Sequence, residues 1–156
     1  MLAGSDQERA RRPGMENLAA IYALGEVCGH LTTSARHDAG QQLRQTGQIR
    51  AGLANDPVMS VVGPDTPEQR LPHMVSFRID GIEPQGVVVG LDRSGFAVHS
   101  GSSCATEDFE PSPVLAAMAL SGDAVRVSVG WSTTDDDVTQ FLGALRKVVQ
   151  ELQSLS

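Results

Sequence analysis

The stretch Val125–Val149, VRVSVGWSTTDDDVTQFLGALRKVV, contains the pattern that decides the fold. Its first five residues alternate valine with Arg126 and Ser128, which predicts a strand with one apolar face. Thr134 and the three aspartates after it predict a helix start, because threonine caps free N–H groups and acidic side chains favour the positive end of the helix dipole. The apolar stripe of this helix is Val138, Phe141, Leu142, Leu145, Val148, Val149 and Leu152.

Shorter patterns upstream predict the remaining elements. A helical stretch begins near Leu18 and reaches Leu53, and its glycines favour a break near Gly29–Ser34. Further strands are expected at Val58–Val62, Met74–Ile79 and Phe96–Val98. Further helices are expected at Pro84–Arg93 and, capped by Ser112, at Pro113–Leu120. We therefore expect an α+β domain, with a small, mostly antiparallel sheet covered by helices on one face. The segments Val75–Ile79, Phe96–Val98 and Val125–Val129 should share that sheet.

Composition argues against several classes of function. The 156 residues carry a net charge of −7, and only one of the 12 basic residues, Lys147, is a lysine. An acidic chain without a basic cluster is a poor nucleic-acid binder. Cys28 and Cys104 lie far apart without the spacing of a zinc site, and neither a signal peptide nor a membrane-spanning stretch is evident. We expect a cytoplasmic protein with reduced thiols, no metal, no nucleic acid and no membrane partner.

The loop His99–Cys104, HSGSSC, concentrates the reactive chemistry. Glycine and serine around Cys104 expose its thiol, and attack on another sulfur needs thiolate character, which a nearby cation or helix N-terminus favours. From the residues alone, Cys104 is equally a loop cysteine of no consequence. His99 could favour the thiolate, but the interpretation as a solvated loop histidine is favoured.

Several motifs, in order along the chain, resemble those of the cysteine desulfurases, which are pyridoxal-phosphate-dependent enzymes of the class V aminotransferase family. The loop Gly95–Cys104, GFAVHSGSSC, and the Glu110-Pro111-Ser112 that follows it are similar to the family's active-site segment. The other matching blocks are Val125–Gly130, Thr133–Val138, Leu71–Pro72 with Val75–Phe77, and Gln7–Asn17. The resemblance implies the small C-terminal domain of a fold-type I enzyme at 31–156, with 1–30 leading out of an absent large domain.

The resemblance also implies roles for individual residues. Cys104 would take sulfur from cysteine as a persulfide, and Arg126, otherwise a surface arginine of a strand, would grip the substrate carboxylate. Met15 stands where the family usually has a threonine that contacts the cofactor phosphate of the partner subunit, and methionine cannot donate that hydrogen bond. The cofactor lysine belongs to the large domain. Lys147, beside Arg146 late in the last helix, is interpreted as solvated, so pyridoxal phosphate is not expected to bind covalently to this chain.

Two functions remain open. In the first, the chain is the C-terminal part of a cysteine desulfurase that converts L-cysteine to L-alanine, with a large domain of the same or a separately encoded chain, a homodimer partner and a sulfur acceptor protein. Such enzymes serve sulfur transfer and iron–sulfur cluster assembly. In the second, it is a non-catalytic remnant or a persulfide-accepting module, and the isolated chain is expected to be inactive either way. The apolar stretch before residue 30 should be exposed, whereas Cys28, on the apolar stripe of a helix, should react with thiol reagents more slowly than Cys104.

Overall fold

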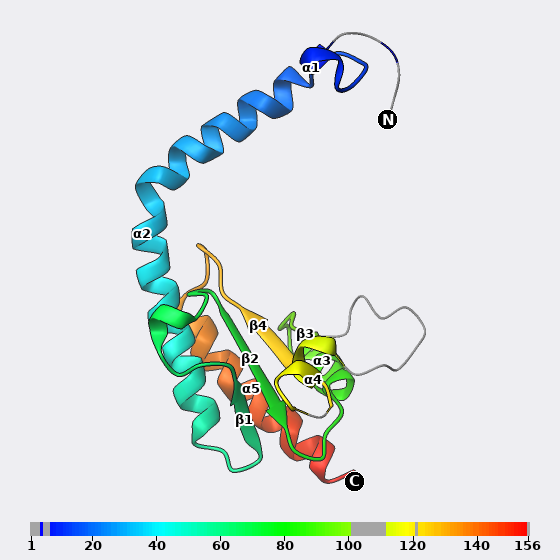
Figure 1. Ribbon diagram of the computed structural model, residues 1–156. Coiled ribbons are helices and arrows are strands. Elements are labelled where there is room, and N and C mark those ends of the chain that lie inside the picture. The colour runs from blue at the N-terminus through cyan, green and yellow to red at the C-terminus, as the bar shows by residue number, and fades with distance from the viewer. Residues whose placement is uncertain (1–3, 5–6, 101–111, 121, 156) are drawn as a thin grey trace. The chain divides into compact units, whose positions relative to one another are not determined.

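The computed structural model describes residues 4, 7–100, 112–120 and 122–155 (Figure 1). The chain is divided into two compact units, Met1–His37 and Asp38–Ser156. The first unit contains a short turn, α1 (Gln7–Ala10), whose Glu8 and Arg9 are left-handed at φ 52° and 58°. It also contains the first part of the long helix α2 (Leu18–Ala54).

Helix α2 is continuous, so the predicted break near Gly29–Ser34 is wrong. The hydroxyls of Thr32 and Thr33 donate to the carbonyls of Gly29 and His30 at 2.7 and 2.8 Å, within the helix itself. Each interior glycine costs only about 1 kcal/mol relative to alanine, and a 37-residue helix tolerates that cost.

The second unit is built on an antiparallel sheet in the strand order β1-β2-β4-β3. Side chains alternate along β2 and β4, so that Val75, Phe77 and Ile79 on one strand and Val125 and Val127 on the other are buried on the same face. A 3₁₀ turn, η1 (Pro67–Gln69), lies between the first two strands. The strands are β1 (Met59–Val62), β2 (Met74–Ile79), β3 (His99–Ser100) and β4 (Val125–Ser128).

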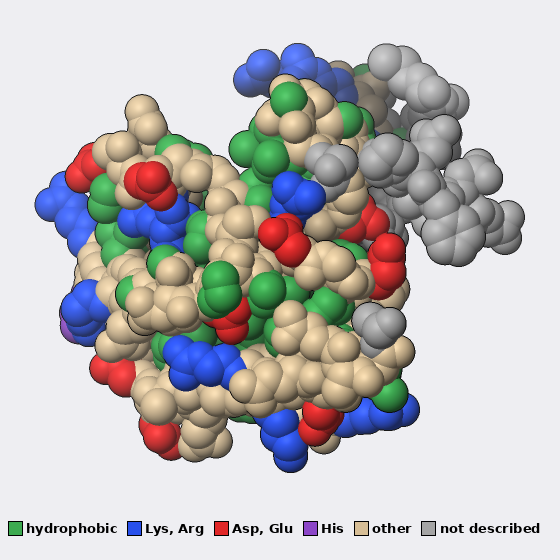
Figure 2. Space-filling model, turned by 90° about the horizontal axis from the view of Figure 1, so that it is seen from below, with side chains coloured by type: hydrophobic (Ala, Val, Ile, Leu, Met, Phe, Trp, Pro, Cys, Tyr) green, Lys and Arg blue, Asp and Glu red, His purple; other side chains and the backbone are tan. Residues whose placement is uncertain are grey.

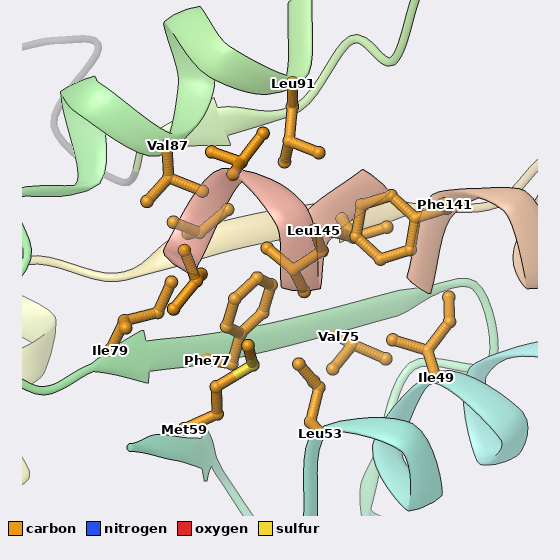
Figure 3. Packing of buried hydrophobic residues seen from close by; sticks show 14 of the residues in the cluster. Ile49, Leu53, Met59, Val75, Phe77, Ile79, Val87, Leu91, Phe141 and Leu145 are labelled. Carbon is orange, nitrogen blue, oxygen red and sulfur yellow. The ribbon is translucent and has the colours of Figure 1, made fainter. Parts of the chain in front are cut away.

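Helices cover this buried face, and the opposite face carries mainly polar side chains together with Val62 and Met74. Figure 3 shows side chains from the end of α2, from α3 (Pro84–Arg93) and from α5 (Asp135–Gln153) converging around Phe77 of β2. The expected α+β fold, with helices on one face of a small antiparallel sheet, is confirmed. We call the opposite face the outer face; it is defined by Ser76, Arg78, His99, Arg126 and Ser128.

Two buried polar side chains attach α2 to loops around the sheet. Gln45 Nε2 donates to the Thr133 carbonyl at 2.7 Å and to Asp135 Oδ1 at 3.4 Å, and Thr46 Oγ1 donates to the Pro72 carbonyl at 3.0 Å. Buried polar groups are destabilising unless they are hydrogen-bonded. These bonds therefore fix how the second half of α2 lies against the turn between β4 and α5.

The predicted start of the last helix is confirmed. Thr134 Oγ1 accepts from the Asp137 N–H at 3.1 Å, while Asp137 Oδ2 accepts from the Thr134 N–H at 2.8 Å, which makes a complete capping box. The hydrogen bonds from the Thr134 backbone and, second, its hydroxyl hold the pKa of Asp137 below its usual value. Both bonds favour the charged carboxylate at the positive end of the helix dipole.

The third strand lies later than predicted. Residues 96–98 are outside the sheet, and pairing begins at His99. The reason is the end of α3, where the Phe96 N–H donates to the Leu91 carbonyl and the Gly95 N–H to the Asp92 carbonyl, both at 2.9 Å. This Schellman motif, with Gly95 at φ 86°, takes the backbone hydrogen bonds that a strand would need. Phe96 instead packs edge-on against Phe141.

Helix α4 (Pro113–Ala117) begins at Pro113 as predicted but ends before the predicted Leu120. It ends in a second Schellman motif, in which the Leu120 N–H donates to the Leu115 carbonyl at 2.9 Å and Ala119 adopts a left-handed φ of 57°. Ser112 occupies the N-cap position, but its side chain makes no capping hydrogen bond, so the predicted cap is wrong in that respect.

Candidate functional site

Arg126 lies on the outer face at the second position of β4, and its side chain is exposed. In the sheet register Arg126 pairs with Ser76 of β2 on one side and with His99 of β3 on the other. Directly opposed residues of antiparallel strands point to the same face, with Cβ atoms about 4.5–5.5 Å apart. A row Ser76–Arg126–His99 therefore crosses three strands of the outer face.

The arginines of the outer face have no acidic partner among the described residues. The ion pairs among the described residues are Arg12–Glu16 at 3.1 Å and Arg50–Asp65 at 2.8 Å, and neither involves Arg78 or Arg126. Arg78 follows Ser76 by two positions and so faces the same way, diagonal to Arg126. A guanidinium without an ion pair among the described residues is a candidate to bind a carboxylate in a two-pronged contact.

His99 is not the solvated loop histidine favoured from the sequence. It is half-buried in β3, and its Nδ1 is buried without a hydrogen-bond partner in the part of the chain that the structure describes. The sequence did not reveal this pairing, because β3 was expected at Phe96–Val98. With β3 displaced, His99 comes to lie opposite Arg126.

Lys147 is exposed on α5, where it lines a groove of about 490 Å³ between α3 and α5 together with Arg93 and Glu151. Helix α5 packs on the buried face of the sheet, whereas Arg126 lies on the outer face. The sheet therefore separates the two side chains. The described residues do not supply a cofactor-binding lysine beside Arg126, so we derive no step through pyridoxal phosphate from this chain.

A second hollow, of about 280 Å³, lies beside residues 95–98, which connect α3 to β3. Its walls include Phe96 and Val98 on one side and Ser128, Thr133 and Phe141 on the other. Arg126 is not among its lining residues, so this hollow is separate from the row on the outer face. Among the described residues, no group of three or more His, Cys, Asp or Glu could hold a metal ion.

The first unit contains Met15 and Cys28, both exposed. Met15 is 85% exposed, and the exposure of Cys28 contradicts its expected protection on a helix stripe. Within this unit, no other described element covers the apolar side chains of α2, which explains why Cys28 is accessible. The expected exposure of the apolar stretch before residue 30 is confirmed for Leu18, Ile21, Tyr22, Leu24 and Val27.

Cys104 and Glu110 lie outside the described residues, and the role predicted for Cys104 stays a prediction. On the face drawn in Figure 2, basic side chains are dispersed among acidic side chains and small apolar groups. In the part of the chain that the structure describes, no helix is both long and apolar enough to cross a membrane.

The model of the Aminotransferase class-V family matches residues 3–141. The chain belongs to this family. Family members depend on pyridoxal phosphate. The whole chain aligns with the cysteine desulfurase NifS of Azotobacter vinelandii at 31% identity and with a cysteine desulfurase of Cereibacter sphaeroides at 34%, in each case over 40% of the relative.

Solved structures agree on the fold of this class V aminotransferase chain. A NifS-like protein from Rickettsia africae superposes with a TM-score of 0.82 at 23% identity, over 96% of this chain and 39% of that protein. A cysteine desulfurase from Thermococcus onnurineus superposes with a TM-score of 0.76 at 22% identity, over 93% of this chain and 34% of that one. The chain thus spans about two fifths of the curated relatives that it matches, including an IscS of Clostridium botulinum at 41%.

Proposed function

We propose that this chain is the C-terminal part of a cysteine desulfurase, in which Arg126 binds the carboxylate of L-cysteine and Cys104 accepts its sulfur. The observation that carries the proposal is the exposed guanidinium of Arg126 on the outer face, without an ion pair among the described residues, in a chain of this family. A planar guanidinium fork matches the two oxygens of a carboxylate.

The proposed reaction balances without an external oxidant or reductant. The carbon–sulfur bond of L-cysteine breaks, a sulfur–sulfur bond forms on Cys104, and the carbon gains a proton, so that L-alanine and an enzyme persulfide result. Pyridoxal phosphate supplies the electron sink for this chemistry when it is bound, and residues outside this chain must hold it. This chain contributes the carboxylate contact of Arg126 and the sulfur-accepting thiol of Cys104.

The exposed apolar side of α2 offers a surface for the missing large domain. Leu18, Tyr22 and Leu24 are 70%, 72% and 64% exposed. Several exposed apolar side chains on one helix are typical of an interaction surface, whereas a single one is ordinary. The proposal includes the family homodimer, a cytoplasmic location and a sulfur acceptor protein that removes the persulfide for iron–sulfur cluster assembly. In the homodimer, Met15 would weaken contact with the cofactor phosphate, since its thioether donates no hydrogen bond.

A non-catalytic, persulfide-accepting module is the second candidate. Two observations favour it: the sheet lies between Lys147 and Arg126, and Met15 occupies the place of a phosphate-contacting threonine. In this function Cys104 would receive sulfur from another protein's persulfide, and Arg126 would bind no amino acid.

Adding a matching large domain to the chain and following alanine release tests the first function. Arg126→Ala should raise KM for L-cysteine about tenfold to hundredfold, because it removes a charge-assisted contact worth about 1.5–3 kcal/mol. Arg146→Ala, which removes an exposed arginine of α5, is the matched control and should leave KM unchanged. Cys104→Ser should abolish turnover, since a hydroxyl cannot carry a persulfide.

A negative result also separates the two functions. A mixture that binds, loads cofactor and makes no alanine would contradict the desulfurase proposal. Met15→Thr is then the first reversion to try. Persulfide transfer to Cys104 from a separate donor would support the module instead.

A further inference from the structure

We propose that His99 is a second carboxylate-binding residue, which donates from Nε2 to one oxygen of the group that Arg126 holds. This inference rests on the proposed function, because it assigns to the same site a second contact with the substrate.

The register of β3 and β4 carries the proposal. His99 is directly opposite Arg126, so both side chains leave the sheet on the outer face with Cβ atoms about 4.5–5.5 Å apart. A carboxylate against the guanidinium of Arg126 therefore lies within reach of the imidazole. Ser76 lies on the other side of Arg126, but its hydroxyl is only one bond beyond Cβ and reaches less far over the face.

The burial of Nδ1 indicates which nitrogen of His99 donates. Nδ1 is buried and has no hydrogen-bond partner among the described residues. A neutral imidazole has one N–H donor and one acceptor nitrogen. Buried N–H groups without an acceptor are rarer than buried acceptors without a donor, so the proton is better placed on Nε2. Nε2 is the ring atom farther from the backbone, and in this proposal its N–H donates to the anion over the outer face.

Nuclear magnetic resonance of the 156-residue chain, labelled with nitrogen-15, tests this contact directly. Acetate supplies the carboxylate alone, and acetamide at constant ionic strength is the neutral control. We expect acetate, and not acetamide, to shift the Arg126 guanidinium and the His99 Nε2 resonances with the same apparent Kd.

Variants then measure the contribution of the imidazole. His99→Ala should weaken acetate binding roughly threefold to tenfold, the worth of one hydrogen bond. His99→Asn, which keeps an N–H donor, should recover part of that loss. Ser60→Ala, at an exposed position of β1, is the control and should leave the Kd unchanged. Amide shifts of β4 in each variant report whether the sheet is intact.

The outcomes separate this inference from the proposed function. A shift at Arg126 without one at His99, and an unchanged Kd in His99→Ala, would overturn the role of His99 and leave the carboxylate site of Arg126 standing. No shift at either residue, with Arg126→Gln behaving as the wild type, would overturn both. In the assembled enzyme, His99→Ala should raise KM for L-cysteine and leave kcat within about twofold, because the contact holds the substrate in ground and transition states alike.

Discussion

Replacing Gly90 by alanine tests the packing of α3 against α5. A Cβ at Gly90 would lie 2.5 Å from Cγ1 and 3.1 Å from Cγ2 of Val148, both closer than normal contact. Val148 is 4% exposed, and a β-branched side chain in a helix has one strongly preferred rotamer, so its methyl groups cannot turn away. Overpacking of this kind costs about 1–3 kcal/mol.

Gly143→Ala in α5 is the matched control, because nothing lies within 4 Å of the added Cβ and the position is exposed. Both changes gain about 1 kcal/mol of helix propensity. Gly90→Ala should therefore have a free energy of unfolding about 1–3 kcal/mol below that of Gly143→Ala. Urea unfolding followed by circular dichroism measures the difference.

Removing the methyl groups that cause the clash provides a second check on this packing. In a Val148→Ala background, Gly90→Ala should lose most of its penalty, which a double-mutant cycle measures as coupling between the two sites. Equal stabilities of Gly90→Ala and Gly143→Ala, or additive effects in the cycle, would refute the reasoning.

Four further predictions concern a cap, a strained residue, a thiol and a lysine. Thr134→Ala should lower the free energy of unfolding by about 1 kcal/mol in urea, through loss of the N-cap. The cap lowers the pKa of Asp137, so its contribution to the free energy of unfolding is present above the unfolded-state pKa and is lost as pH falls through the lower folded-state pKa. The stability of the wild type should therefore approach that of the variant in acid. A stability difference that stays constant down to strong acid would contradict this. Ala119→Gly should stabilise the chain by about 1 kcal/mol, because glycine adopts the φ of 57° without strain; a thermal melt that shows no gain would be evidence against the strain. Exposed Cys28 should be alkylated in the native chain about as fast as in urea, and strong protection seen by mass spectrometry would mean that another surface covers it. Borohydride reduction of the chain with pyridoxal phosphate should leave Lys147 unmodified, and a stoichiometric adduct there would overturn its interpretation as a solvated lysine.

Local sequence patterns were sufficient for the elements whose hydrogen bonds are local. The capping box at Thr134, the helix Pro84–Arg93 and the alternation along β4 each follow from neighbouring residues, and each was predicted with close boundaries. The first half of α2 shows the limit of the pattern. Apolar residues at helical spacing correctly predict a helix, but spacing does not tell which surface covers them, so Cys28 was expected to be protected and is exposed.

The site could be predicted only in part, because its geometry depends on pairing between distant segments. The motif around Arg126 predicted a role that stays a prediction, and the alternation of β4 indicated that its side chain leaves the apolar face. Its neighbours on the outer face follow from the cross-strand register, which no local pattern contains. His99 was therefore assigned to a loop.

The end of α3 helps to determine where β3 begins and thus which residue lies opposite Arg126. Gly95 allows the chain to turn at a left-handed φ of 86°, and the Phe96 N–H is taken by the helix carbonyl of Leu91. The edge-on contact of Phe96 with Phe141 then holds the next residues against the helices, and pairing with β4 starts only at His99. Because side chains alternate along a strand, a shift of the β3–β4 pairing register by one residue would turn His99 toward the buried face. The C-terminal cap of α3 and the contact between Phe96 and Phe141, both outside the row, therefore help to place the imidazole of His99 beside the guanidinium of Arg126.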